Sequence, residues 1–332
     1  MNIRRLVAVA LLGACLVGAS TALAAPRAGR DAAASNASSA AEDAAVAAWM
    51  RQLDRTHNRV PEGRALRPRN YVPDQNGYYH VIDDFEQAGK DLDVFKGWVL
   101  VEDLNGALYG DYYWGVSNCN HKSGIGERSA WAIGNGAQGS GLQCGAYYPH
   151  GVNSSALLRL DLSGFPEDVD ALELVFDFWL NLRTEVEGGV VPDGLFVTYH
   201  LPTAVGDSPF ERVVVAKLTG QLADRFWDTP WRIQLNALTD LNDPERVYNV
   251  AGLADVDIEF IMVTKQFDGT TYPAGVYMDN LRLEASEAPG TPQIRTPSPV
   301  TPKPTTPTTP TTPSVTAETP TAETPTAETP TA

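Results

Sequence analysis

Residues 172–180 alternate strictly between two kinds of side chain. Every second residue, from Leu172 to Leu180, is Leu or Phe, whereas Glu173 and Asp177 fall on the opposite side. A period of two is the spacing of a β-strand, in which successive side chains point to opposite faces of a sheet. The segment therefore predicts a sheet with one face packed and the other facing solvent or a ligand.

Other runs of β-forming residues, bounded by Gly, Pro, Asn or Asp, lie on both sides of this segment. Together with it they cover 80–84, 98–102, 130–133, 156–162, 171–181, 194–200, 212–218, 231–238, 256–264 and 275–284. The strands do not alternate with helices, which predicts an all-β fold. We expect an antiparallel β-sandwich of the jelly-roll type over residues 79–287.

The chain begins like a secretory signal. Arg4 and Arg5 precede an apolar run at 6–17 that is too short to span a bilayer comfortably, and small residues follow up to Ala24. This pattern predicts a signal peptide at 1–24 that is cleaved near Ala24. We therefore expect a secreted or cell-surface protein with no transmembrane span in the mature chain. A lipoprotein signal, in which Cys15 is lipidated, is the alternative.

Two segments flank the β-rich region. Residues 25–78 form a linker or propeptide, and within them 40–55 can form an amphipathic helix that docks elsewhere. The apolar face of this helix would hold Val46, Trp49, Met50 and Leu53. Residues 288–332 are rich in Thr and Pro and cannot bury an apolar core, which predicts a disordered, extended stalk.

Charge and cysteine content limit the partners. The formal net charge of −16 argues against nucleic acid, because phosphate binding needs clustered Lys and Arg. After signal cleavage, Cys119 and Cys144 are the remaining cysteines in a compartment where thiols oxidise, so we predict a disulfide. A two-cysteine metal site with His121 or His150 is the weaker alternative, because the zinc-ligand spacing is missing.

Aromatic residues cluster on both sides of the predicted disulfide. The candidate ligand-binding residues are Tyr109, Tyr112, Tyr113, Trp114, Tyr147 and Tyr148. Exposed aromatic rings can stack against the C–H faces of sugars, so the cluster suggests a carbohydrate site. The alternative is packing in the core or in loops, as we expect for the strand residues Trp131, Trp179 and Trp231.

The first and last strands carry a family resemblance. Residues 82–86 read Ile-Asp-Asp-Phe-Glu, with Trp98 a dozen residues on, and residues 275–283 read Gly-Val-Tyr-Met-Asp-Asn-Leu-Arg-Leu. This order resembles the MAM-like accessory domain found beside immune-inhibitor-type metallopeptidases, and related carbohydrate-binding-like modules. The resemblance implies a secreted jelly roll and supports fold better than function.

The resemblance also implies a structural calcium ion where the first and last strands meet. Carried over by position, its ligands would be Asp84, Glu86 and Asp279, with Asp83 in reserve. Calcium prefers six to eight oxygen ligands, which carboxylates on adjacent strands help to supply. The alternative is that these acids are ordinary strand-end residues in contact with water.

Catalytic motifs are missing from the sequence. There is neither a His-Glu-x-x-His motif nor a Gly-x-Ser-x-Gly nucleophile elbow. We therefore expect a non-catalytic module that binds an extracellular glycan or other polymer. A protein-interaction or structural surface module is the alternative, and a tethered jelly-roll glycosidase or lyase, which needs only two carboxylates, is the third.

Overall fold

The computed structural model describes residues 28–60, 62–68, 72–74, 77–86, 98–106, 108, 110–122, 126–182, 193–203, 208–219, 227, 229–264, 275–287 and 289–290. In the first helix, side chains are described from residue 42 onward. The predicted signal at 1–24 with Cys15, the ligand candidate Tyr109 and the stalk beyond residue 290 lie outside these residues.

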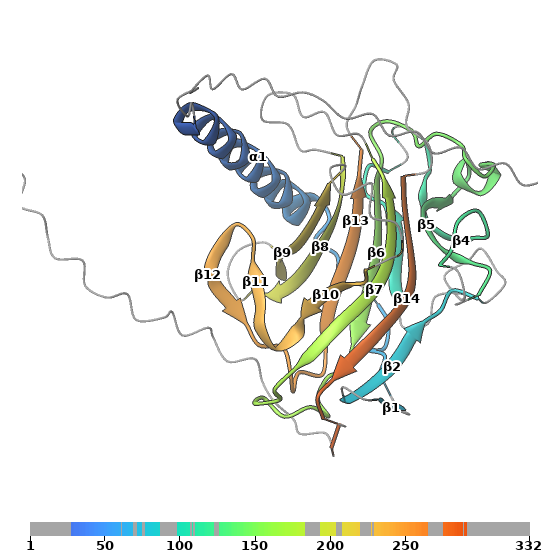
Figure 1. The fold of residues 1–332 in the computed structure, drawn as a ribbon. Coiled ribbons are helices and arrows are strands. Elements are labelled where there is room, and N and C mark those ends of the chain that lie inside the picture. The colour runs from blue at the N-terminus through green and yellow to red at the C-terminus, as the bar shows by residue number, and fades with distance from the viewer. Residues whose placement is uncertain are drawn as a thin grey trace, which may run out of the picture.

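The described residues form a β-sandwich with one long helix, α1 (Ala28–Thr56). Two sheets face each other, as Figure 1 shows. The strands are β1 (Val72–Asp74), β2 (Gly77–Asp83), β3 (Trp98–Asp103), β4 (Tyr113–Ser117), β5 (Ser129–Asn135), β6 (Asn153–Leu160), β7 (Leu172–Asn181), β8 (Gly194–Pro202), β9 (Phe210–Thr219), β10 (Trp231–Gln234), β11 (Leu238–Asp240), β12 (Asp243–Tyr248), β13 (Val256–Val263) and β14 (Gly275–Ala285).

The five-stranded sheet has the order β3-β6-β13-β8-β9, and the seven-stranded sheet has the path β1-β2-β14-β5-β4 with β7 joining β14 to β10. Every pairing between these strands is antiparallel, and β11 pairs with β12 in a separate hairpin. The predicted antiparallel β-sandwich is therefore confirmed. All ten predicted strand runs contain a strand, whereas β1, β4, β11 and β12 were not expected.

The alternation in β7 builds the core as the sequence predicts. Phe176 points between the sheets, where its ring lies 5.5 Å from that of Phe260 on β13. Trp98 of β3, in the same sheet as Phe260, meets the Phe260 ring at 5.6 Å, so Phe176 packs near two aromatic side chains of the facing sheet. The opposite side of β7, with Asp177 and Trp179, therefore belongs to the outer face of the seven-stranded sheet.

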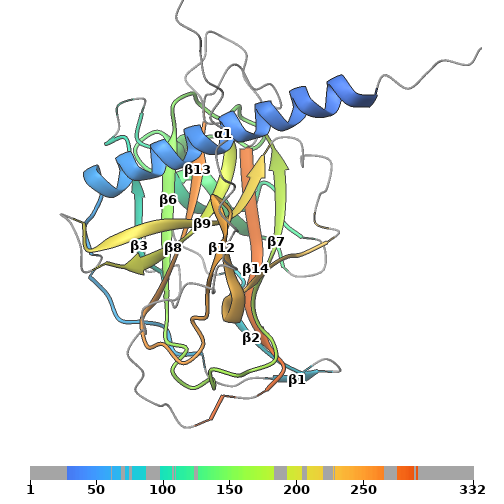
Figure 2. The same cartoon turned by 90° about the vertical axis from the view of Figure 1, so that its left-hand side faces the viewer.

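Helix α1 is longer than the predicted 40–55 and lies across the outer face of the five-stranded sheet (Figure 2). Its apolar face holds the expected residues: Val46, Met50 and Leu53 are buried and Trp49 is half-buried. They pack against sheet residues Leu104, Phe196, Val214, Ile261 and Val263. No helix among the described residues is long and apolar enough to cross a membrane.

Candidate functional site

An aromatic row crosses the outer face of the seven-stranded sheet. Tyr277 of β14 is the cross-strand partner of Trp131 on β5 and of Trp179 on β7, so the three side chains share one face. The rings of Trp131 and Tyr277 stack at 5.4 Å and 9°, and Trp179 meets Tyr277 edge-on at 5.5 Å. Trp131 and Tyr277 are only 2% and 1% exposed, so these two rings are covered by other protein atoms. The row therefore mainly supports the residues that pack on it.

A hollow of about 400 Å³ lies at the Trp131 end of this row. We call it the disulfide hollow, and its lining residues are Val116, Ser117, Asn118, Cys119, Arg128, Trp131, Gly134, Gly139, Ser140, Leu142, Gln143 and Cys144. The side chains of Asn118, Ser140 and Gln143 are exposed, so hydrogen-bonding groups at its rim reach solvent. The hollow thus combines amides, hydroxyls and one guanidinium with an indole beneath them.

The predicted disulfide is present and joins two walls of the hollow. Cys119 follows β4, Cys144 follows the short 3₁₀ turn at Gly139–Gly141, and the two Cα atoms are 4.9 Å apart. The amide of Cys119 also donates to Ser117 Oγ at 3.0 Å, which holds the turn after β4 in place. The bridge therefore holds Asn118 on one wall near Gln143 on the other.

Removing the bridge is expected to affect both stability and the shape of the hollow. A Cys119→Ser, Cys144→Ser double variant should unfold with a free energy roughly 3 kcal/mol lower, because its unfolded chain is no longer restricted. Urea unfolding of oxidised wild type, reduced wild type and the variant measures this, with the reduced wild type matching the variant. Equal stability of all three would show that the bridge holds nothing in place.

The structure divides the predicted aromatic cluster. Trp114 and Tyr148 are buried, at 0% and 2% exposure, and the hydroxyl of Tyr148 donates to Asp193 Oδ2 at 2.9 Å. Tyr147 is 58% exposed, and Tyr112 and Tyr113 are half-buried. A glycan can therefore reach Tyr147, whereas Trp114 and Tyr148 belong to the packed interior.

The acids proposed for calcium are only partly brought together. Asp83 Oδ1 accepts from the Phe85 amide at 2.9 Å and Oδ2 from the indole of Trp98 at 3.2 Å, so this side chain ties β2 to β3. Asp84 Oδ1 accepts from the amide of Glu86 at 3.4 Å within the same turn. Glu86 is close enough to Asp279 for the two carboxylates to repel each other.

Asp279 instead has a partner that sequence reasoning missed, its cross-strand neighbour Asp177. Both carboxylates are fully buried on the outer face of the seven-stranded sheet. Asp279 accepts from the amides of Lys122 and Asn280, and the Lys122 ammonium lies 2.7 Å from Asp177 Oδ1. Burial, followed by repulsion from Asp177 and Glu86, raises the pKa of Asp279 to about 6 despite the two amide hydrogen bonds.

This arrangement does not fit the predicted calcium ion. Glu86 Oε1 is bound by the amides of Glu127 and Arg128, and the Lys122 ammonium neutralises Asp177. The described residues include no group of three or more His, Cys, Asp or Glu that could hold a metal ion. Calcium binding stays a prediction of the family resemblance, and we derive no function from it.

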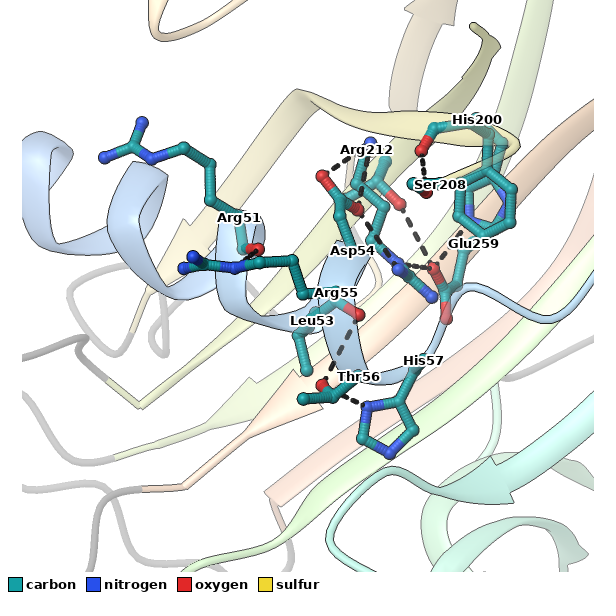
Figure 3. Close-up of polar contacts among 12 residues, drawn as sticks. Arg51, Leu53, Asp54, Arg55, Thr56, His57, His200, Ser208, Arg212 and Glu259 are labelled. Carbon is teal, nitrogen blue, oxygen red and sulfur yellow. Dashed lines mark hydrogen bonds and ion pairs between the residues drawn. The ribbon is translucent and has the colours of Figure 1, made fainter. Parts of the chain in front are cut away.

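A second polar assembly lies on the outer face of the five-stranded sheet, beneath the C-terminal end of α1 (Figure 3). It consists of Asp54 from α1, His200 from β8, Arg212 from β9 and Glu259 from β13, and we call it the buried ion cluster. Glu259 Oε2 lies 2.7 Å from both His200 Nε2 and Arg212 Nε. Its other oxygen accepts from Ser155 Oγ at 2.5 Å.

In the buried ion cluster, the negative charge of Glu259 is compensated by neighbouring cationic and hydrogen-bonding groups. Burial alone would raise the pKa of Glu259, but the charges of Arg212 and His200 and their hydrogen bonds outweigh it and hold the pKa well below its usual range. Burial raises the pKa of Asp54, and Arg212 offsets this only in part. Because Glu259 is 1% exposed and fully hydrogen-bonded, this carboxylate is held as an anion rather than presented as a general acid.

Sequence reasoning missed the buried ion cluster because its members are far apart in the chain. One signal was present: Glu259 stands between the apolar residues Ile258 and Phe260 of β13. A buried acid in such a strand needs a cationic partner, and His200 and Arg212 stand in neighbouring apolar strands. Which cation pairs with it depends on strand order, and strand order is not visible in the residue pattern.

No protein-family model and no curated protein matches this chain. Among solved structures, it is similar to a family 11 carbohydrate-binding module from Clostridium thermocellum in complex with a β-1,3-1,4-mixed-linked tetrasaccharide, at 13% identity and a TM-score of 0.31, over 63% of this chain and 96% of that one. It is also similar to the isomalto-dextranase of Arthrobacter globiformis T6 complexed with panose, at 14% identity and a TM-score of 0.22, over 56% of this chain and 23% of the enzyme. These comparisons identify no family, and the resemblance to MAM-like domains stays a prediction.

Proposed function

We propose that the protein is a secreted, non-catalytic module that binds a neutral glycan in the disulfide hollow. The observation that carries the proposal is the lining of this hollow, in which solvent-facing amides and hydroxyls surround a depression of about 400 Å³. Depressions of this size, with a few convergent polar groups over an apolar base, are typical of small-ligand sites.

The chemistry of the lining matches sugar hydroxyls. The amides of Asn118 and Gln143 each offer two donors and one acceptor oxygen, so one side chain can bind two neighbouring hydroxyls of a ring. Arg128 adds a planar donor without an acceptor, and Ser140 a hydroxyl that serves as either. Such a set recognises a ligand whose groups both donate and accept, as sugar hydroxyls do.

The disulfide contributes by keeping the walls in register. A pocket that is already formed loses less conformational entropy on binding than one that must be ordered by its ligand. Since Asn118 is adjacent to Cys119 and Gln143 to Cys144, the bridge positions both amides directly. Binding should therefore be weaker after reduction, in parallel with the loss of stability predicted above.

An Asn118→Ala, Gln143→Ala double variant tests the proposal. Each lost hydrogen bond contributes about 1 kcal/mol, so the dissociation constant for a bound neutral glucan should rise by at least about tenfold. Affinity electrophoresis in gels that contain mixed-linked β-1,3-1,4-glucan, dextran or cellulose derivatives identifies the bound polymer and measures the loss. Gln234→Ala, an exposed amide on β10 away from the hollow, is the matched control and should bind like wild type.

Two outcomes would contradict the proposal. One is a wild-type protein that none of the neutral glucans retards. The other is a double variant that binds as tightly as the Gln234→Ala control, because the hollow then has no part in binding.

A further inference from the structure

The buried ion cluster is assembled almost entirely by the sheet. Ser155, His200 and Arg212 all bond Glu259 from strands β6, β8 and β9, and the ring of Phe210 stacks on His200 at 4.1 Å. Asp54 is the member that α1 supplies (Figure 3). The face beneath the helix therefore has an organised set of polar groups of its own.

Helix α1 binds this face through a carboxylate and an aromatic ring, two kinds of group that a ligand could also supply. Asp54 Oδ1 lies 3.2 Å from both the backbone nitrogen and Nη1 of Arg212, a carboxylate held by a main-chain amide and a guanidinium. One and a half turns earlier, the indole of Trp49 packs at 5.5 Å on the ring of Phe196.

A second cation on β9 also binds acids of α1. Lys217 Nζ lies 2.8 Å from both Glu42 Oε1 and Asp43 Oδ1. Lys217 lies five positions after Arg212, about 16 Å away at the rise of a strand, so an occupant that bonds both must span that distance. The helix satisfies this spacing with acids at both ends of its docked half.

The face also holds polar groups that α1 does not satisfy. His200 is 4% exposed, and its Nδ1 has no hydrogen-bond partner among the described residues. Burial, followed by repulsion from Glu259, raises the pKa of the nearby Glu102, and the charges of Arg59 and Arg212 offset this only in part. If this face served only to bind α1, pairing His200 Nδ1 and Glu102 with groups of the helix would increase the stability of the protein. The unpaired groups therefore suggest a further ligand.

The chain that follows α1 can be cut without dividing the sandwich. Arg59 and Arg64 are exposed on either side of exposed Val60, Glu62 and Gly63. From Gly63 onward the chain is held on the sheet, because the carbonyl of Gly63 accepts from Arg159 Nη1 at 3.2 Å, the amide of Leu66 bonds Arg159 O, and the carbonyl of Leu66 accepts from Asp161. Cleavage between Arg59 and Val60, which are both exposed, would therefore release α1 and leave the strands joined.

We propose that α1 is a removable cover over a second binding site, a face of the five-stranded sheet that takes an acidic polysaccharide. A uronate carboxylate takes the place of Asp54 on Arg212, and a sugar ring replaces Trp49 on Phe196. Ring hydroxyls reach His200 Nδ1 and Glu102, and a later carboxylate along the polymer pairs with Lys217. The site differs from the disulfide hollow in place, since it lies on the other sheet, and in ligand charge.

The test inserts the recognition sequence of a site-specific protease between Arg59 and Val60 of the full chain, which keeps the bond between Gly63 and Arg159. Polygalacturonate is the probe, and mixed-linked β-1,3-1,4-glucan is the neutral comparison. After cutting and removal of α1, verified by mass, the affinity for polygalacturonate should rise at least about tenfold over the uncut chain, while glucan binding does not change. Lys217→Gln in the cut chain, which removes the cation proposed for the later carboxylate and leaves the buried ion cluster intact, should abolish most of the gain.

Should the cut helix remain bound, a Leu53→Ala, Asp54→Ala change in the same chain weakens its contact. Arg51→Ala is the matched control, because Arg51 is exposed and points away from the cluster in Figure 3. An uncovered chain that binds polygalacturonate no better than the uncut one overturns the proposal. So does a chain whose circular dichroism shows unfolding without α1, because the helix is then part of the core. Neither outcome bears on the disulfide hollow, which the glucan arm tests separately.

Discussion

Replacing Arg212 with Met is expected to lower the free energy of unfolding by about 3 to 5 kcal/mol. Arg212 has a side chain that is 3% exposed, and it bonds both Glu259 and Asp54. Methionine fills a similar volume but leaves Glu259 with His200 as its remaining ionisable partner in the interior. The cost is that of an incompletely compensated buried charge, which exceeds the energy of the lost contact itself.

The matched control is Arg232→Met. Arg232 also bonds two carboxylates, on Glu173 and Glu284, but its side chain is 44% exposed and neither acid is buried, so water replaces the lost partner. We expect a loss below about 1 kcal/mol for this variant. Urea unfolding of both proteins at neutral pH provides the comparison, and equal losses at the two sites would show that the buried ion cluster contributes no more than a surface ion pair.

The Asp279→Asn variant is expected to be more stable than wild type by about 2 kcal/mol at neutral pH. The folded-state pKa of Asp279 is raised from 3.8 to about 6, so the folded protein holds a proton that the unfolded chain has already released. The free energy of unfolding of wild type therefore falls as the pH rises through this window and stays low above it. Asparagine cannot ionise, and its loss of one amide hydrogen bond offsets part of the gain.

Unfolding curves between about pH 5 and pH 7 measure the effect. This range avoids the opposite contribution of Glu259, whose lowered folded-state pKa stabilises the protein above 4.5 and is lost in more acid solution. The difference between variant and wild type should shrink toward pH 5, whereas an Asp168→Asn control, at an exposed acid, should show none. A variant that is less stable than wild type at pH 7 would contradict the account of the Asp177–Asp279 pair.

The same titration with millimolar calcium tests the ion that the family resemblance implies. Binding to the folded state raises stability by mass action and would remove the pH dependence due to Asp279. A calcium-dependent rise in wild type that the Asp279→Asn variant lacks would establish the ion. Without such a rise, Lys122 is the cation that the acidic pair uses.

The layer structure follows from local pattern. The alternation along β7 predicts that Phe176 points inward and Asp177 outward, as the structure shows. This prediction succeeds because the alternation of side chains depends only on the pleat of a single strand. The docked face of α1 is likewise read from the spacing of Val46, Met50 and Leu53. The disulfide was predictable because the expected loss of Cys15 with the signal leaves one pair among the three cysteines of the sequence.

The candidate sites depend on strand order and register, which the pattern does not contain. Asp177 and Asp279 are a hundred residues apart and meet because β7 and β14 pair in one particular register. Trp114 was a candidate ligand-binding residue together with Tyr112 and Tyr113. In β4 its side chain points to the opposite face from that of its neighbour Tyr113 and is buried in the core. The rim of the hollow, with Asn118 and Gln143, is formed by two loops that the disulfide joins over β4 and β5, and loop geometry is not determined by residue type alone.

The most direct measurement of the central claim is a nuclear magnetic resonance titration with a soluble neutral gluco-oligosaccharide. Side-chain amide signals of Asn118 and Gln143 and the backbone signal of Ser140 should shift together and saturate with one dissociation constant. Reduction of the Cys119–Cys144 bridge should weaken that constant, since the two walls are then no longer joined. Shifts confined to other parts of the sandwich, or none at all with any of the glucans, would contradict glycan binding in the disulfide hollow.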